Sequence, residues 1–175
     1  GVVKLANQML AVAVREGATG PQRRATHAAL AALVPEVEQQ ARHMALADSR
    51  PDGAVADALE RAATATAARG SPSAAAELAA LAVARTPETD HDDRARRRLD
   101  LAALCFRLGD TDEAVGLARS VLGSPTTDDM HARALLLLGE VEFENGISEI
   151  AVAHCLSGLQ LVTDDVGLQA RLHAQ

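Results

Sequence analysis

The side chains most able to do chemistry in this sequence are six histidines and two cysteines, and their spacing predicts no reactive site. The histidines, His27, His43, His91, His131, His154 and His173, are scattered, and no two stand at metal-ligand spacing on one helix face. Cys105 and Cys155 belong to no CxxC pair, which predicts reduced thiols in a core. The GxxxxGKS/T loop, the GxSxG elbow and the HExxH motif are all absent. We therefore expect no catalytic residue, metal ligand or cofactor within this chain.

Two small groups of residues leave an alternative open. His91 lies among the acidic residues of segment 90–93 and could in principle hold a metal ion, but a solvated linker and helix start is favoured. His154 directly precedes Cys155, and adjacent residues point to different sides of a helix. A catalytic dyad is therefore disfavoured.

The one basic cluster is the RARRR run at residues 94–98. It could contact DNA or an acidic partner. The interpretation we favour is the exposed start of a helix, because Glu88, Asp90, Asp92 and Asp93 come just before it and cancel its field.

Composition favours an all-α protein that does not itself bind nucleic acid. Of the 175 residues, 48% are apolar but only 1% are aromatic, so a core must be built from closely packed Ala and Leu, which are good helix formers. The net charge of −7 and the pI of about 5.3 argue against a nucleic-acid surface. Neither a signal peptide nor an apolar run long enough to span a membrane is present, so we expect a cytoplasmic location.

An internal repeat organises the second half of the chain. Residues 99–122 match residues 136–159 after a shift of 37 positions (136 − 99), which superposes Phe106 on Phe143 and Gly109 on Gly146. Such a period is typical of helical repeats. Each Gly suits the left-handed turn between two helices, and each Phe, three residues earlier, is expected to pack between neighbouring units.

An earlier segment follows the same template around Gly70, so we predict three helix-turn-helix units at about residues 53–87, 92–125 and 129–162, and the start of a further helix. Five residues after each turn Gly comes a small residue, Ala75, Ala114 or Ala151, that lets the two helices approach closely. Residues 1–50 form a separate helical segment, beginning with a predicted helix at 3–15, although Val2, Val3 and Leu5 could begin a strand instead. The predicted N-caps are Thr19, Ser71, Asp110, Thr163 and Asp164.

The spacing resembles the tetratricopeptide repeat, in which a Leu-Gly pair, a central Gly and a later Ala recur. The third unit carries this pattern at Leu138, Gly139, Gly146 and Ala151, with Leu159 after it. The second unit matches with one change, and the first matches weakly. The resemblance implies helix pairs stacked into a right-handed superhelix.

A second resemblance covers nearly the whole chain. An Arg-Arg-Ala-x-His-x-x-Leu-Ala run at residues 23–31 and an Ala-x-His-x-Ala-Leu-Ala run at 41–47 are similar to the large ATP-binding LuxR-type transcription regulators of actinobacteria. The resemblance implies that this chain is an excised piece of such a regulator. It would hold the end of a winged-helix domain within residues 1–50 and the first sensor repeats after it. ATP binding, and DNA binding through a helix-turn-helix, would belong to modules outside the chain.

The register of the repeats places one set of polar residues on the concave face of the predicted array. Three rows are expected to line a ligand or partner groove of mixed charge: Asp57, Arg96 and Arg133; Thr64, Ala103 and Glu140; and Ala68, Arg107 and Glu144. We therefore expect a non-catalytic sensor and interaction module that binds an inducer, a protein partner or neighbouring domains, and that can form a homodimer. A free-standing scaffold for a protein or peptide is the alternative, and an enzyme is disfavoured.

Overall fold

The computed structural model describes residues 17–162 and 165–174, and within these ranges it is all-helical, without a strand. The helices are α2 (Gly20–Leu33), α3 (Val37–Ala47), α4 (Gly53–Ala68), α5 (Pro72–Arg85), α6 (His91–Arg107), α7 (Thr111–Leu122), α8 (Asp128–Glu144), α9 (Ser148–Leu159) and α10 (Val166–Ala174). The helix predicted at residues 3–15 lies outside the described residues. The all-α prediction is therefore confirmed for the described part of the chain.

Contacts divide the chain into two compact units, Gly1–Arg50 and Pro51–Gln175. In the described part of the first unit, α2 packs against α3. None of the helices described in either unit is both long and apolar enough to cross a bilayer.

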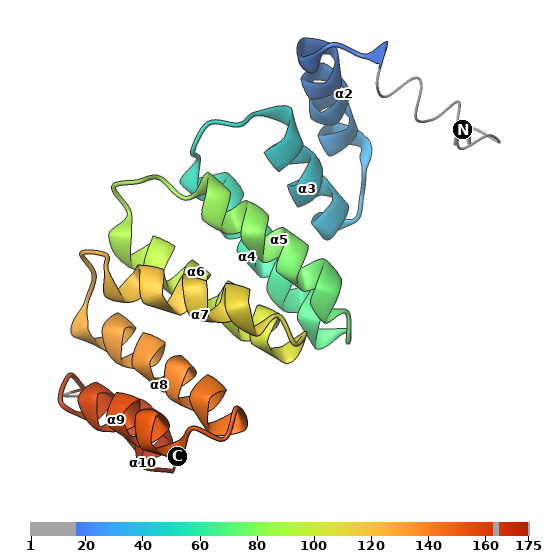
Figure 1. The fold of residues 1–175 in the computed structure, drawn as a ribbon. Helices are drawn as coiled ribbons and strands as arrows, with labels where there is room; N and C mark the ends of the chain where they lie inside the picture. Colours follow the sequence, from blue (N-terminus) through green and yellow to red (C-terminus); the bar gives the residue numbers. More distant parts are fainter. Residues whose placement is uncertain (1–16, 163–164, 175) are drawn as a thin grey trace. The chain divides into compact units, whose positions relative to one another are not determined.

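The second unit is a succession of helical hairpins. Helix α4 packs on α5, α6 on α7, and α8 on α9. Contacts between α5 and α6 and between α7 and α8 join each hairpin to the next. Figure 1 shows these pairs following one another from cyan to red, with α10 beside α9. We call α4, α6 and α8 the first helices of the three hairpins.

The hairpins turn at Gly70, Gly109 and Gly146, whose φ angles are +80°, +82° and +79°. In the middle hairpin, the N–H of Gly109 donates to the Phe106 carbonyl at 2.9 Å and that of Asp110 to the Cys105 carbonyl at 2.9 Å. The other two turns repeat this pair of bonds, which satisfies the last carbonyls of a helix when a residue adopts a left-handed conformation. The predicted role of these three glycines is confirmed.

Small residues bring the paired helices together. Ala75, Ala114 and Ala151 are buried, as predicted from their distance to the turns. At Gly139, on the face of α8 that meets α9, a Cβ atom would lie 2.9 Å from Sγ of Cys155. A larger side chain would therefore push the two helices apart.

The predicted helix starts have mixed outcomes. Thr19 forms a full capping box with Gln22, and the Asp110 carboxylate accepts the N–H of Glu113. Ser71 occupies the N-cap position as predicted, but its side chain makes no capping hydrogen bond. Pro72 at the first helical position has no N–H to be satisfied. The predicted caps Thr163 and Asp164 lie outside the described residues.

Ala and Leu make up most of the buried core, as the composition predicts. One apolar cluster joins α6, α7 and α8, and Phe106 packs against it. A second cluster joins α8, α9 and α10 through Leu136, Cys155 and Leu168. The prediction that Phe143 also packs between units is wrong, because 53% of it is exposed. The α10 cluster covers α8 around Leu136, two helical turns before Phe143.

Candidate functional site

The surface of the first helices is hollowed: three hollows lie where neighbouring hairpins meet, and one lies on α4 alone. All seven candidate residues line these hollows: Asp57, Thr64, Arg96, Arg107, Arg133, Glu140 and Glu144. Ala103 of α6 lines three of the hollows, so they are continuous around it. We call this continuous surface of α4, α6 and α8 around Ala103 the first-helix groove.

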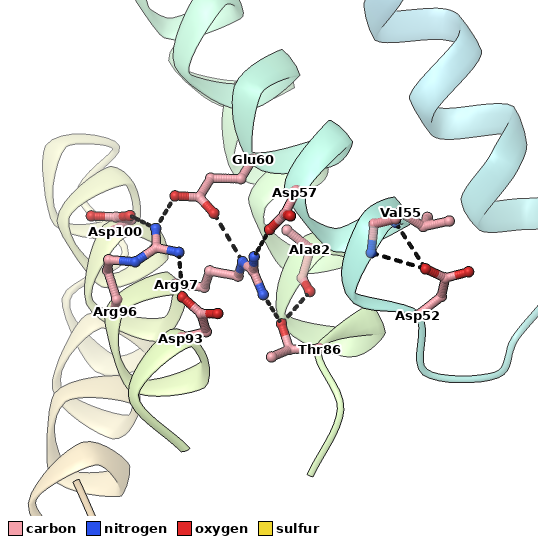
Figure 2. A network of polar contacts seen from close by, with 11 residues as sticks. Asp52, Val55, Asp57, Glu60, Ala82, Thr86, Asp93, Arg96, Arg97 and Asp100 are labelled. Carbon is pink, nitrogen blue, oxygen red and sulfur yellow. Dashed lines mark hydrogen bonds and ion pairs between the residues drawn. The ribbon is translucent and has the colours of Figure 1, made fainter. Parts of the chain in front are cut away.

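A buried arginine, Arg97, holds the first two hairpins together at one end of the groove. Its side chain is only 2% exposed. Figure 2 shows its guanidinium between helices: Nε donates to Glu60 at 2.9 Å, Nη1 donates to the Thr86 hydroxyl at 2.9 Å, and Nη2 pairs with Asp57. The Thr86 hydroxyl in turn donates to the Ala82 carbonyl at 2.8 Å. Every face of the buried cation is therefore met by an acceptor, which its desolvation requires.

Arg96 extends the same network toward the solvent. Its guanidinium pairs with Glu60, with Asp93 at 2.8 Å and, at the longer distance of 3.9 Å, with Asp100. Glu60 thus bridges two arginines of α6 from its place on α4. The carboxylate and the two guanidiniums compensate one another's charge within the protein.

These pairs correct the favoured interpretation of the RARRR run. Residues 94–98 are not simply an exposed helix start neutralised by the acids just before them, because Arg97 is buried and its partners are on α4, about 40 positions back in the chain. Of the preceding acids, Asp93 does pair with Arg96. No DNA-binding arrangement follows, since the two central arginines are occupied by carboxylates.

The row of Asp57, Arg96 and Arg133 lines the hollows, but its members do not pair with one another. Asp57 pairs with Arg97 instead of Arg96, and Arg133 pairs with Asp165 at 3.3 Å. Residues one position apart on a helix point about 100° apart, so a shift of one position moves the contact to another row. The row is still on one surface, but its charges are paired with neighbours that the repeat alignment did not include.

Glu140 also has a partner that the sequence analysis missed. Its carboxylate accepts a hydrogen bond from Arg171 of α10 at 2.9 Å, and both residues line the hollow between α6 and α8. The available signal was a basic residue in the further helix, and Arg171 lies in the last turn of α10. The sequence did not give the position of this helix relative to the repeats.

Two candidate residues, Arg107 and Glu144, make no hydrogen bond or ion pair within residues 17–162 and 165–174. They line the same hollow, together with Phe106 and Phe143. Thr64, by contrast, donates its hydroxyl proton to the Glu60 carbonyl of its own helix at 3.0 Å. Arg107 and Glu144 are thus the predicted charges that are available to a partner.

Asp100 belongs to the groove but was missed by the sequence analysis. It lines the hollows on both sides of α6. Desolvation by the surrounding side chains raises the pKa of its carboxyl, and the opposing effects of Arg96 and Arg133 are smaller. Since 60% of the side chain is still exposed, water screens much of this perturbation. Asp100 therefore places a carboxyl group with a modestly perturbed pKa on the same helix as Arg107.

The described residues contain no grouping typical of a metal site. Within residues 17–162 and 165–174 no three His, Cys, Asp or Glu side chains are grouped as metal ligands, and His91 is exposed. Cys105 and Cys155 are buried and unpaired, and burial raises the pKa of both thiols, which lowers their nucleophilicity. The predicted core thiols are therefore confirmed.

One histidine pair was not expected. His27 of α2 and His43 of α3 stack, with Nδ1 atoms 3.0 Å apart. Burial and the neighbouring His27 lower the pKa of His43. The prediction considered only pairs on one helix, and this one joins two.

Compared with models of known protein families and with curated proteins, the chain matches none of them. The functional argument therefore rests on the groove and on the residues around it.

Proposed function

We propose that this chain is a tetratricopeptide-like repeat module that acts by binding and not by catalysis. The observation that carries the proposal is the first-helix groove, which runs continuously around Ala103 over three hairpins with equivalent Gly turns. Stacked helical repeats present such extended surfaces to peptides and other partners. Most of the groove's charges are engaged with one another, which suits recognition better than proton or group transfer.

The binding partner we favour is a protein segment in extended or helical form. Arg107 and Glu144 offer one free charge of each sign on neighbouring first helices, and the exposed ring of Phe143 lies beside them. A partner with an apolar side chain flanked by an acidic and a basic residue complements this arrangement. The small side chain of Ala103 leaves room for the apolar group.

At the level of the whole protein, we propose that the module is the sensor and interaction arm of a LuxR-type ATP-binding transcription regulator. The support is the resemblance of residues 22–47 and the repeat pattern that follows. In this proposal the protein acts in the cytoplasm, ATP and DNA bind to other modules, and the groove receives an inducer or a partner. Sequencing the gene on both sides tests it: a phosphate-binding loop before the segment and a helix-turn-helix after it are expected. Finding neither would support a free-standing scaffold instead.

The groove itself is tested with peptides. Peptides selected from a displayed random library against the intact chain are measured for affinity to three proteins: the native chain, Ala103→Arg and Ala80→Arg. Ala80 is exposed on α5 and lines none of the hollows described, so it controls for the added charge and bulk. Ala103→Arg is expected to weaken binding about tenfold or more, which corresponds to about 1.4 kcal/mol, while Ala80→Arg stays within about twofold. Equal loss in both variants would exclude the groove as the binding surface.

A further inference from the structure

A cavity of about 270 Å³ lies between the first two hairpins, where α4, α5 and α6 meet. Six of its eleven lining residues have apolar side chains: Ala63, Ala67, Ala79, Ala82, Ala103 and Leu104. The other five are polar: Glu60, Thr64, Arg97, Asp100 and Arg107. The hollow arises because most of the apolar side chains stop at Cβ. The cavity is partly open to solvent.

The charges around this cavity are unequally compensated. At the inner end, Arg97 and Glu60 bind one another and further partners, so they offer no net charge to a ligand. Asp100 has Arg96 at 3.9 Å, and its pKa is raised by desolvation. Arg107 lines the cavity and makes no ion pair within the described ranges 17–162 and 165–174. The carboxylates and the buried arginine of the lining thus each have a charged partner, and Arg107 is the charged group of the lining without one in the described ranges.

We propose that this cavity binds a medium-chain aliphatic carboxylate. The hydrocarbon chain would lie against the alanine walls, where it loses contact with water, and the carboxylate would pair with the guanidinium of Arg107. Asp100 lies seven residues before Arg107 on α6, about 10 Å along the helix axis. The ligand's anionic end can therefore meet Arg107 without approaching Asp100.

The chemistry of the lining selects against other ligands of this size. A sugar or a nucleotide needs many hydrogen-bond partners, and most of the side chains around the cavity are apolar. An aliphatic amine would find no unpaired carboxylate in the lining, because Glu60 and Asp100 each have an arginine within 4 Å. This inference rests on the proposed sensor function, because it names the chemical class of the ligand.

Octanoate is the test ligand, and its binding to the intact chain is measured by isothermal titration calorimetry. Arg107→Gln removes the charge from an exposed position, so folding is not expected to change, which circular dichroism checks. Arg119→Gln, on an exposed site of α7 that lines none of the hollows described, is the matched control. Arg107→Gln is expected to weaken octanoate about tenfold or more, in line with the loss of a charged hydrogen bond, and Arg119→Gln to stay within about twofold.

Two further ligands and one further variant separate the contribution of apolar contacts to the affinity from that of the charge. Octanol should bind the native chain and Arg107→Gln equally, and octylamine should bind more weakly than octanoate. Ala67→Leu, which fills the cavity from its wall, should weaken both octanoate and octanol.

Three results would overturn the inference: no saturable binding of octanoate by the native chain, equal affinity of octanoate for Arg107→Gln, or octylamine binding as tightly as octanoate. Failure with octanoate while the selected peptides still bind would leave the proposed function intact. Failure of both ligand classes would remove both proposals.

Discussion

Removing the two carboxylates that hold Arg97 should destabilise the protein more than removing Arg97 itself. The arginine is 2% exposed, whereas the Asp57 side chain is 55% exposed. Asp57→Ala with Glu60→Ala therefore leaves a buried cation without a counter-charge. After Arg97→Met, the Asp57 carboxylate can be solvated by water, and Glu60 still has its ion pair with Arg96.

The burial of each group determines the expected change in the free energy of unfolding. Leaving a buried charge unpaired costs about 3–5 kcal/mol, and this is the expected loss for Asp57→Ala/Glu60→Ala. Arg97→Met loses charge-assisted hydrogen bonds but also removes the desolvation penalty of the guanidinium, so a net loss of about 1–2 kcal/mol is expected. The Thr86 hydroxyl still donates to the Ala82 carbonyl after either change. The triple variant should therefore recover about 2 kcal/mol relative to the double variant.

Urea denaturation measures these free energies of unfolding. Circular dichroism follows the whole chain, and alkylation of the buried Cys105 of α6 reports on the second unit alone; coincident transitions justify a two-state treatment. The control is Arg119→Met, because Arg119 is exposed on α7, whereas Arg85 is itself buried. Arg119→Met should change the free energy of unfolding by less than about 0.5 kcal/mol. A triple variant no more stable than the double variant would refute the reasoning.

Three further predictions follow from local geometry. Gly109→Ala should destabilise by about 1–2 kcal/mol because φ is +82°, whereas Gly116→Ala, in an exposed helical position with open space around it, should stabilise by up to about 1 kcal/mol; urea melts measure both. Cys105 and Cys155 should resist iodoacetamide at pH 8 until urea unfolds the chain, and rapid alkylation of the folded protein would contradict their burial. The first turn of α10 and a neighbouring arginine lower the pKa of Asp165, so the stability that its ionised form adds is present above the unfolded value of 3.8 and lost as the pH falls below it. Thermal melts should show Asp165→Ala as less stable than the native chain at pH 7, with the difference shrinking below pH 3.8; a constant difference would rule out ionisation as the cause.

The helices and turns of the described chain could be predicted because their signals are local. Pro72 at a helix start and Gly109 at a turn act through their own backbone geometry, so neighbours far away in the chain change little. Burial of Ala114 followed from its fixed distance to that turn. The burial predicted for Phe143 was wrong because it depends on elements outside the hairpin that pack against α8, and the local sequence does not specify them.

The groove could be predicted as a surface but not as a set of contacts. The repeat alignment placed Asp57 and Arg96 in one row, and it did not indicate that the neighbouring Arg97 would pair with Asp57. Alignment by the turn glycines fixes the position along a helix axis, but a rotation of one residue, about 100°, is decided by side-chain packing across the interface. The ion pair of Glu140 with Arg171 also depends on how α10 returns to α8.

Packing of α6 decides which of its residues can meet a ligand. This helix contacts α5, α7 and α8, and it also binds α4 through Arg97, so little of its circumference stays in solvent. In its second half, the exposed positions are Asp100, Ala103 and Arg107, which recur at steps of three and four residues and therefore form one stripe. That stripe is the centre of the first-helix groove. Arg96 and Arg97 stabilise the scaffold behind it, and ligand selectivity is expected to follow the residues at positions 100, 103 and 107.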